Sequence, residues 1–406
     1  MTKSAELSIH EAVARLCAAL AAVSEREIVS LREAAGRVLA SDVVAPFDIP
    51  AFDNAAMDGY ALRADDAATG RPLRAIGRAL AGHAYGGHVD AGTCVRIMTG
   101  APLPDGADAV AMIEHVREED GGIQVEGPIA RGTNVRRRGE HVTAGDAVLR
   151  AGRWLTPACI GMATLVGAAD VAAFRRLRVG VLSTGDELAD PPAALAAAAS
   201  YDANRPTLVA AARRLGFDTS DLGICADEPS DFARVLGAAL DLRLDALIVS
   251  GGAAQGDADI VRQAGGIEFL PLNFRPGRGI AFAHLRRGDA VLALLGLPGN
   301  AVAAFIMFHL VARPVLLHLA GADTSVPRHL SLPLAVDVEV RGGRIEYRRA
   351  RFVGGADGRI AVAPLKEQGS AMLRTVTDAD ALIALGPQPR YRAGEPVGTI
   401  PLALLE

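Results

Sequence analysis

The chain has 406 residues, a formal net charge of −5, and a composition that is 50% hydrophobic with 44 glycines. This length predicts roughly two to four domains, each with ample core, and the composition excludes a disordered chain. Because the chain is slightly acidic overall, we expect no nucleic-acid partner, and any basic site must be local.

Neither a signal peptide nor a membrane span is expected. The first sixteen residues, MTKSAELSIHEAVARL, carry acids where a signal peptide would have an apolar core, so a cytoplasmic location is predicted. The longest apolar run, 301–312, is followed by Arg313-Pro314 and is too short to cross a bilayer. The cysteines are far apart in sequence, which favours buried free thiols in a reducing compartment: Cys17, Cys94, Cys159 and Cys225.

The first 175 residues predict helices at two places and short strands between them. Two Ser-x-x-Glu patterns, beginning at Ser8 and Ser30, match the capping box that opens a helix. The first would open an amphipathic helix with one apolar side: Val13, Leu16, Cys17, Leu20 and Val23. Residues 46–140 are rich in Gly, Pro and short alternating runs, which indicates a β-rich module. Within 143–175 we expect a strand and then a helix with Pro157 in its first turn.

From residue 177 onward, strands and helices alternate. Predicted strands cover 177–183, 219–226, 245–250, 267–274 and 290–298, and predicted helices cover 205–216, 229–240 and 257–265, with another from Asn300. Such alternation is typical of a mostly parallel sheet covered on both faces. After Gly321 the pattern returns to strands. The predicted fold is therefore multidomain α/β plus β: a central doubly wound sheet, a β-rich lobe and a C-terminal domain resembling a β-barrel or sandwich.

Three turns rich in Gly, Ser and Thr follow strands of this sheet, at 183–187, 250–252 and 297–300. Parallel strands bring such turns to one edge, where bare backbone and helix N-termini suit a phosphate. Any one of them could be a tight turn and nothing more. The convergence of three favours a ligand site.

Acidic residues stand in or near these turns: Asp186, Glu187, Asp257 and Asp259. Carboxylates beside phosphates repel them unless a cation lies between, and Mg²⁺ held by one or two carboxylates resolves this conflict. Helix capping is the competing explanation, above all for Asp257 at the start of its predicted helix.

A basic cluster, 275–278, contains Arg275 and Arg278, whose guanidinium groups suit an oxyanion such as phosphate or molybdate. Surface charge is the alternative. A second basic run, 134–141, has two equally good interpretations: one of its arginines contacts an anion, or the run is a solvated loop. The isolated His115 and His141 favour structural roles.

Several motifs occur in an order that goes beyond these general patterns: FDNAAMDGYALRADD, RIMTGAPLPDGADAVAMIEHV, RRRGEHVTAGDAVLRAG, VLSTGDEL, SYDANRPTLVAAARRLG, LIVSGGAAQGDAD, RPGRGIAFA and GLPGNAVAAF. Together they resemble the molybdopterin molybdenumtransferase family over almost the whole chain. The AMDGYA and TGAPLPDGADAV motifs are the most specific in combination, whereas the glycine turns alone would be weak.

The resemblance implies an elongated homodimer of four-domain subunits. Expected here are an extended domain from 1–52 and 142–174, a β-rich lobe at 53–141, a central domain at 175–322 and a C-terminal β domain at 323–406. It also implies that adenylylated molybdopterin is cleaved with release of AMP in a step that needs a divalent cation, expected to be Mg²⁺, and that molybdate is placed on the dithiolene. The site would lie between the central domain of one subunit and parts of the other. A molybdopterin adenylyltransferase or a client molybdoenzyme is the macromolecular partner implied besides the second subunit.

The same resemblance assigns roles to individual residues. The pterin and phosphate loops would be Thr184, Gly185, Asp186 and Glu187; Ser250, Gly251 and Gly252; and Pro298, Gly299 and Asn300. Expected catalytic acids are Glu187, Asp186, Asp58 and Asp259, with Asp58 entering the partner's site, and expected metal ligands are Glu187, Asp257 and Asp259. Further expected binding residues are Arg275, Arg278, Asp227, Arg349 and Ser370.

Some loops depart from the family's pattern. SGGVSVGEADY reads here as SGGAAQGDADI, which loses a hydroxyl at Ala254, and two lysines of KPGKP are Arg275 and Arg278. These changes leave open an alternative function: a diverged paralogue that binds molybdopterin or the finished cofactor as a carrier or maturation factor. An unrelated phosphotransfer enzyme that shares the central sheet is a second alternative, which the flanking motifs disfavour.

Overall fold

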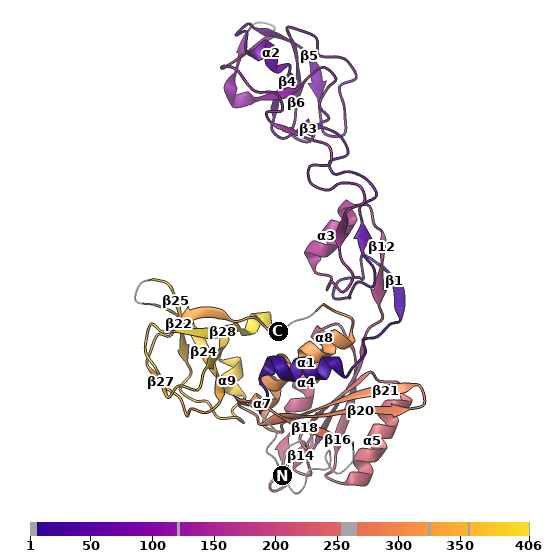
Figure 1. Cartoon of the computed structure of the whole chain (residues 1–406), viewed down its shortest axis with the longest axis vertical. Helices are drawn as coiled ribbons and strands as arrows, with labels where there is room; N and C mark the ends of the chain where they lie inside the picture. Colours follow the sequence, from indigo (N-terminus) through magenta and orange to yellow (C-terminus); the bar gives the residue numbers. More distant parts are fainter. Residues whose placement is uncertain (1–5, 120–121, 253–265, 324–325, 356–357, 406) are drawn as a thin grey trace.

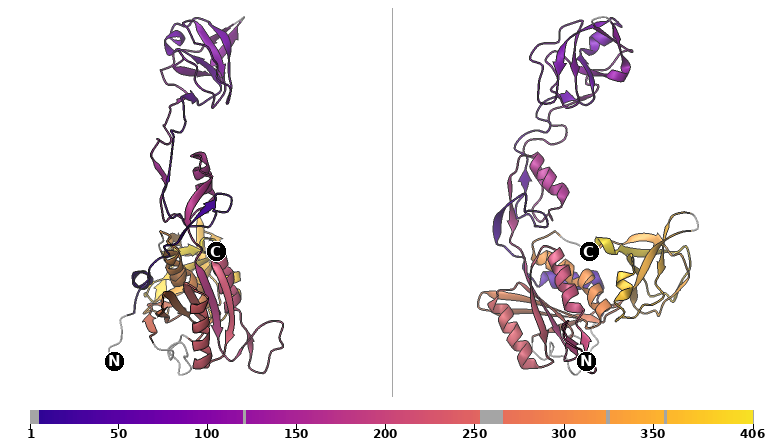
Figure 2. Two further views of the ribbon diagram at one scale, coloured as in Figure 1. Left: turned by 90° about the vertical axis from the view of Figure 1, so that its right-hand side faces the viewer. Right: turned by 180° about the vertical axis from the view of Figure 1, so that it is seen from behind.

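The structure, a computed structural model, describes residues 6–119, 122–252, 266–323, 326–355 and 358–405. The molecule is elongated (Figure 1). A β-rich lobe forms one end, two long connecting segments lead through a narrow middle part, and the central sheet forms the other end with the C-terminal β structure beside it. The view from behind shows the same succession of bodies (Figure 2).

The narrow middle part is built from two short antiparallel strand pairs and one helix. Strand β1 (Arg26–Ser30) pairs with β12 (Asp170–Phe174), and β2 (Val43–Val44) pairs with β11 (Ala147–Leu149). Helix α3 (Pro157–Leu165) begins with its proline, as predicted, and Thr156 caps it. The second predicted capping box is wrong, because Ser30 ends strand β1 and its carbonyl accepts a turn hydrogen bond from Glu33 N.

Helix α1 (Ile9–Ala18) begins with the predicted capping box at Ser8. It ends earlier than the apolar pattern indicated, so Leu20 and Val23 lie beyond it. The helix packs against the central core and helix α8 rather than on β1 and β12.

The lobe contains a six-stranded sheet in the order β7-β4-β6-β5-β9-β8. This sheet confirms the β-rich character predicted for this part of the chain. The strands are β4 (Gly59–Leu62), β5 (Leu73–Ala79), β6 (Thr93–Ile97), β7 (Ala109–Met112), β8 (Val116–Glu119) and β9 (Gly122–Val125). Shorter elements complete it: β3 (Asn54–Ala55), β10 (Val135–Arg136), helix α2 (Ala64–Ala67) and the turn η1 (Ile113–His115).

The central sheet has the order β16-β13-β17-β21-β20-β18. Its first four strands are parallel, which confirms the mostly parallel prediction, and β20 runs antiparallel to both of its neighbours, β21 and β18. They are β13 (Arg178–Thr184), β16 (Asp218–Cys225), β17 (Ala246–Ser250), β18 (Glu268–Pro271), β20 (Gly279–Arg287) and β21 (Ala290–Leu297). Strand β20 is not among the predicted strands. Beside the sheet, β14 (Leu188–Ala189) pairs with β15 (Ser200–Tyr201).

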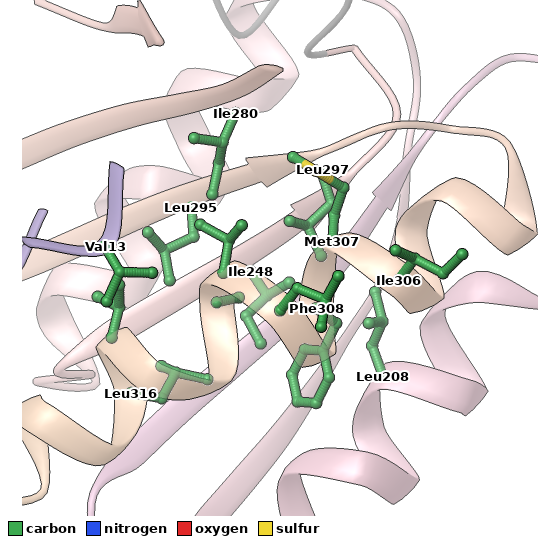
Figure 3. Close-up of a cluster of buried hydrophobic side chains, with 14 of the residues drawn as sticks. Val13, Leu208, Ile248, Ile280, Leu295, Leu297, Ile306, Met307, Phe308 and Leu316 are labelled. Carbon is green, nitrogen blue, oxygen red and sulfur yellow. The ribbon is translucent and has the colours of Figure 1, made fainter. Parts of the chain in front are cut away.

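Helices cover both faces of this sheet. On one face, α4 (Asn204–Arg214) and the helix stack α7 (Ala301–Met307), η2 (Phe308–Ala312) and α8 (Arg313–Leu319) bury side chains such as Ile248. Figure 3 shows how Met307, Phe308 and Leu316 of the stack meet the strands there. On the other face, α5 (Pro229–Asp241) packs against Leu247 and Val249. The predicted helix at 257–265 lies outside the described residues.

The stack α7–η2–α8 corrects one expectation. Arg313-Pro314 does not end the helix, because a π-helical turn at Phe308–Ala312 precedes the proline and places it at the start of α8. Ala301–Leu319 is therefore long and apolar enough to cross a membrane by length and composition, but 83% of its most apolar window is buried inside the fold. It is the core helix of the central domain.

The C-terminal part is a curled sheet in the order β19-β24-β26-β28-β22, with β25 added on β24. Its pairings are antiparallel except that β19 runs parallel to β24. Ala335 N donates to Val362 O of β25 (2.9 Å), which brings the chain after β22 back to the far edge. Its elements are β19 (Phe274–Arg275), β22 (Leu330–Pro333), β23 (Val338–Glu339), β24 (Ile345–Gly354), β25 (Ile360–Pro364), β26 (Ala381–Leu385), β27 (Arg390–Tyr391), β28 (Pro396–Pro401), helix α9 (Arg374–Thr377) and the turn η3 (Leu402–Leu404).

Strand β19 shows that the predicted strand 267–274 is in fact two. Strand β18 ends at Pro271 in the central sheet, and Phe274-Arg275 pairs with β24 of the C-terminal sheet. A proline has no N–H to continue a ladder, so the chain can leave the sheet there. Arg275 is thereby placed between the two domains.

Candidate active site

The three glycine-bearing turns meet at the C-terminal edge of β13, β17 and β21, as predicted. Asn204, at the start of α4, joins two of them: its Nδ2 donates to Ser250 Oγ (2.8 Å) and to Gly299 O (2.6 Å). Asp202 fixes this start, since its Oδ1 accepts from the backbone N–H of Asn204 (3.0 Å) and of Arg205 (3.1 Å). The turns are therefore tied to one another and not merely adjacent.

Gly251 is the position where only glycine fits. Its φ is +92°, and a Cβ there would lie 2.4 Å from Thr184 O and 2.9 Å from Thr184 Oγ1. The first and second turns thus pack backbone against backbone. Beneath them the hydroxyls of Ser183 and Thr184 are buried and have no hydrogen-bond partner in the part of the chain that the structure describes. Polar groups buried in this way are uncommon, and they mark this edge as a place where something else binds.

We call the carboxylates of Asp186, Glu187 and Asp227 the acidic edge. Asp186 and Glu187 are exposed on the first turn, and Asp186 Oδ1 accepts from Asp227 N (3.0 Å). The pKa of Asp227 is raised by burial first and then by the negative charges of Asp186 and Glu187. No cation in the described part of the chain pairs with these three side chains. The acidic edge therefore carries negative charge that a bound cation would neutralise.

The predicted Mg²⁺ ligands are only partly described by the structure. Among residues 6–119, 122–252, 266–323, 326–355 and 358–405, no three His, Cys, Asp or Glu side chains form a group that could hold a metal ion. Glu187 is present at the sheet edge, whereas Asp257 and Asp259 lie outside the described residues. The hard oxygen donors of the acidic edge suit Mg²⁺ chemically, and substrate phosphates commonly supply the remaining ligands.

A cleft of 1390 Å³ runs beside this edge, between the central and C-terminal domains. We call it the basic cleft, because its lining contains seven cationic side chains: Arg275, Arg278, Arg341, Arg344, Arg348, Arg349 and Lys366. Glu346 lies 2.8 Å from Arg348 and 3.9 Å from Arg275, and Arg344 pairs with Glu6. Two acids thus partly offset the arginines. The side chains of Arg278 and Lys366 have no partner among the described residues.

Arg349 is the most buried cation of the cleft, with 1% of its surface exposed. Among the described residues it has no carboxylate partner: its Nε donates to Thr375 Oγ1 (2.9 Å) and its Nη2 to Gly369 O (3.1 Å). Burial, and then the charge of Arg348, lowers its pKa to about 10. An arginine held this way by neutral acceptors retains a charge that an oxyanion can complement.

The third turn connects the acidic edge to the basic cleft. Pro298 and Asn300 line the cleft, while Gly299 between them is bonded to Asn204. Ser370, predicted from the C-terminal domain, also lines the cleft, and its carbonyl accepts from Val302 N (2.9 Å) in the first turn of α7. The structure thus brings together most of the predicted residues: Thr184, Gly185, Asp186, Glu187, Asp227, Ser250, Gly251, Gly252, Arg275, Arg278, Pro298, Gly299, Asn300, Arg349 and Ser370.

Asp58 is the predicted residue that a single chain does not bring to this place. It lies just before β4 in the lobe, and its Oδ1 accepts from Thr99 N (2.7 Å) and Thr99 Oγ1 (2.8 Å). The lobe is at the opposite end of the molecule from the central sheet (Figure 1). The basic run 134–141 also stays with the lobe and its connections, where Arg137 and Arg138 pair with Asp53 and Asp48.

Several functional candidates were missed by the sequence-based prediction. Asn204 stands inside the motif SYDANRPTLV, and its position at a predicted helix start next to Asp202 could have identified it. The other cleft arginines lie around a β-strand: Arg341 and Arg344 precede β24, and Arg348 lies within it. Nothing in the sequence separates them from ordinary surface charge.

Comparison with family models matches three regions in order. Residues 7–167 match the MoeA N-terminal region (domain I and II), residues 180–318 a probable molybdopterin binding domain, and residues 331–402 the MoeA C-terminal region (domain IV). The second match contains the whole acidic edge, and the third contains Arg341 and most of the other cleft residues of the C-terminal sheet.

Individual proteins show the same relationship. A molybdopterin molybdenumtransferase of Haemophilus influenzae is 34% identical over 93% of this chain and 94% of that protein. A molybdopterin molybdenumtransferase 2 of Mycobacterium tuberculosis is also 34% identical, over 87% and 89%. The crystal structure of the molybdopterin biosynthesis moeA protein from Pyrococcus horikoshii OT3 has a TM-score of 0.82 at 28% identity, covering 98% of this chain and all of that one. The chain therefore belongs to the molybdopterin molybdenumtransferase family.

Proposed function

We propose that this chain inserts molybdenum into molybdopterin, using adenylylated molybdopterin and molybdate and releasing AMP. The observation that carries the proposal is the third turn, in which Gly299 belongs to the glycine turns and Pro298 and Asn300 belong to the basic cleft. One short segment thus joins a phosphate-type site to an oxyanion-type site. That is the juxtaposition a reaction between a phosphoanhydride and molybdate requires.

The glycine turns bind the pyrophosphate part of the substrate. Backbone N–H groups at strand ends and helix starts hold phosphate oxygens, and Gly251 permits close approach. Asn204 keeps Ser250 and Gly299 in register, so the donors are fixed before the substrate arrives.

The acidic edge supplies carboxylate oxygens for Mg²⁺: Glu187 as the predicted ligand, with Asp186 and Asp227 beside it. When bound, Mg²⁺ supplies positive charge to the phosphate oxygens during cleavage. Glu187 and its neighbours orient the cleaved group. Asp257 and Asp259 remain proposed ligands from the segment outside the described residues. No protein nucleophile is needed, because the attacking group belongs to the substrates or to water.

The basic cleft holds molybdate next to the pterin. Arg349 is fixed by Thr375 and Gly369, Arg275 lies on β19 of the same C-terminal sheet, and Arg278 lines the cleft just before β20 of the central sheet. Fixed guanidinium groups bind a tetrahedral oxyanion without large reorganisation. In the proposed cytoplasmic homodimer, Asp58 of a second copy completes the site, which would explain why it lies so far from it within one chain.

The experiment supplies purified protein with adenylylated molybdopterin, Mg²⁺ and molybdate, and follows both AMP release and cofactor formation. The proposal predicts AMP release that depends on all three additions, together with formation of active cofactor. Tight binding of the substrate without molybdate-dependent AMP release would contradict it, and would favour instead a carrier or maturation role.

A further inference from the structure

A second cavity, of 730 Å³, lies on the helical side of the central domain. Three parts of the chain enclose it: helix α4, the stack α7–η2–α8, and the C-terminal segment 403–405, with Trp154 of the middle part at its side. It shares no lining residue with the basic cleft. Its volume falls in the range of small-molecule sites, roughly 300–1,000 Å³.

The walls of this cavity are mainly aromatic and aliphatic. Phe305 and Phe308 come from the helix stack, Ala211 and Leu215 from α4 and its end, and Leu404 from the C-terminal segment. Leu404 is 64% exposed although it is apolar. An apolar body entering the cavity would cover this surface.

Two polar side chains that line the cavity have atoms without a hydrogen-bond partner among the described residues. These atoms are Nδ1 of His309, which is 2% exposed, and Nε of Arg313. The two residues are four apart on the π-helical turn and the start of α8, a local geometry often found at functional sites. The ring of His309 is held between Phe305 (centroids 4.4 Å apart) and Phe308 (5.1 Å).

A histidine of the same stack shows what a structural role looks like. His318 Nε2 lies 3.1 Å from Leu20 O, so its ring nitrogen is satisfied by the backbone. His309 has no such contact, and Arg313 has no ion pair among the described residues. Buried groups without partners are rare in native folds, and a bound ligand is one of the few physical reasons to keep them.

The charged side chains of the cavity indicate which charge its ligand carries. Burial lowers the pKa of Arg313, and burial together with the charge of Arg313 lowers the pKa of His309 to about 3. A neutral imidazole can donate or accept a hydrogen bond, whereas a guanidinium without an ion pair favours an anion. Arg214 adds a second cation to the lining, while Asp323, the acidic lining residue, is exposed at the mouth.

We propose that this cavity is a binding site for an amphipathic organic anion, a carboxylate or sulfonate attached to an aromatic or alkyl body. The anionic group lies at Arg313 with His309 beside it, and the apolar body lies among Trp154, Phe308 and Leu404. This site is separate from the proposed molybdenum insertion and does not depend on it.

The chain offers a direct optical test, because Trp154 is its single tryptophan and lines the cavity. The probe is 8-anilinonaphthalene-1-sulfonate, an aromatic sulfonate whose fluorescence rises in apolar sites and which accepts energy from tryptophan. Added to the full-length protein, it should bind saturably at one site per chain and quench Trp154. Decanoate, an alkyl carboxylate, should displace it.

Two variants separate the charge of the site from its shape. Arg313→Gln removes the cation, and Ala210→Trp fills the cavity from α4 without changing any charge. Each should weaken probe binding by about tenfold or more, since a charged hydrogen bond or the space for the body is lost. For Ala210→Trp, which adds a second tryptophan, the readout is the enhancement of probe fluorescence. Thermal melts show that both variants are folded.

Matched controls are Arg286→Gln, which removes an exposed arginine elsewhere on the central domain, and Ile28→Ala, which removes an exposed apolar side chain from the middle part. Both should bind the probe as the unmodified protein does. Absence of saturable binding, or binding that survives in both cavity variants, would overturn the proposal.

Discussion

The acidic edge and the basic cleft lie side by side, yet they handle charge in opposite ways. On the acidic edge, no described cation pairs with the three carboxylates, and burial first, then the charges of Asp186 and Glu187, raises the pKa of Asp227. In the basic cleft, Glu346 and Glu6 balance part of the positive charge, and Arg349 is held by neutral acceptors. This difference supports our proposal that the edge binds a cation together with phosphate, whereas the cleft binds a bare oxyanion.

Glu187→Ala should have the largest effect, because it removes a carboxylate from the acidic edge. We expect kcat for AMP release to fall by about 100-fold or more, the scale seen when one charge-stabilising group is lost from an active site. The exposed position of Glu187 means that the fold should survive. Steady-state AMP release measures the effect, with the exposed Glu33→Ala as control. Normal turnover by Glu187→Ala would remove this residue from the mechanism.

Gly251→Ala should distort the junction between the first two turns. The new Cβ would meet the backbone of Thr184, and φ of +92° is unfavourable for alanine, so we expect a loss of about 1–3 kcal/mol in unfolding free energy and weaker substrate binding. Gly288→Ala is the matched control, because its φ is +59° but nothing lies near its Cβ. Denaturant titration measures the unfolding free energy of both variants. Equal losses would show that only backbone conformation matters at Gly251, and not close packing.

Arg278→Gln tests the role of the basic cleft independently of the acidic edge. We expect KM for molybdate to rise by about tenfold, since one charged hydrogen bond to the oxyanion is lost, while binding of adenylylated molybdopterin changes little. Arg286→Gln, outside the cleft, should leave both unchanged. Initial rates at varied molybdate measure this. If KM rose for adenylylated molybdopterin and not for molybdate, Arg278 would bind the pterin substrate, which would contradict its assignment to molybdate.

Asp227→Asn should have the smallest effect, and it should stabilise the protein. Because the pKa of Asp227 is raised above its ordinary value of 3.8 by burial, Asp186 and Glu187, the folded state binds this proton more readily than the unfolded chain does. Stability is therefore lost as pH rises through the folded pKa. The variant should melt higher than the unmodified protein at pH 7, and the gap should close as pH falls towards about 4.

A control for that experiment is Mg²⁺ itself. If the acidic edge binds the cation, added Mg²⁺ should stabilise the unmodified protein more than the variant at pH 7. A variant that melts lower at every pH would contradict the account of Asp227 as an uncompensated carboxylate.

The sequence predicted the glycine turns because their geometry is local. Parallel strands must end at one edge, so Thr184, Ser250 and Gly299 could be placed together from the strand-helix alternation alone. The pairing of Asn204 with Ser250 and Gly299 could not be predicted in the same way. It depends on how α4 is rotated against the sheet, which side-chain packing decides.

The basic cleft was predicted less completely for a related reason. Arg275 and Arg278 follow a visible turn, but Arg341, Arg344 and Arg348 reach the cleft only because β19 joins β24 of the C-terminal sheet. No local pattern encodes that long-range pairing. The helix 301–319 was cut short in the prediction because the π-helical turn before Pro314 is not visible in an apolar run. Asp58 and the domain boundaries stay predictions.

The central claim is that the acidic edge and the basic cleft form one active site. The most direct measurement is the rate of AMP release from adenylylated molybdopterin, with Mg²⁺ present, as molybdate is titrated into the unmodified protein and into Arg278→Gln. We predict that molybdate accelerates AMP release in the unmodified protein and that the curve for the variant shifts to higher molybdate with the same maximum. The claim that the acidic edge and the basic cleft work together would be contradicted if the rate of AMP release did not depend on molybdate in either protein, or if no AMP were released.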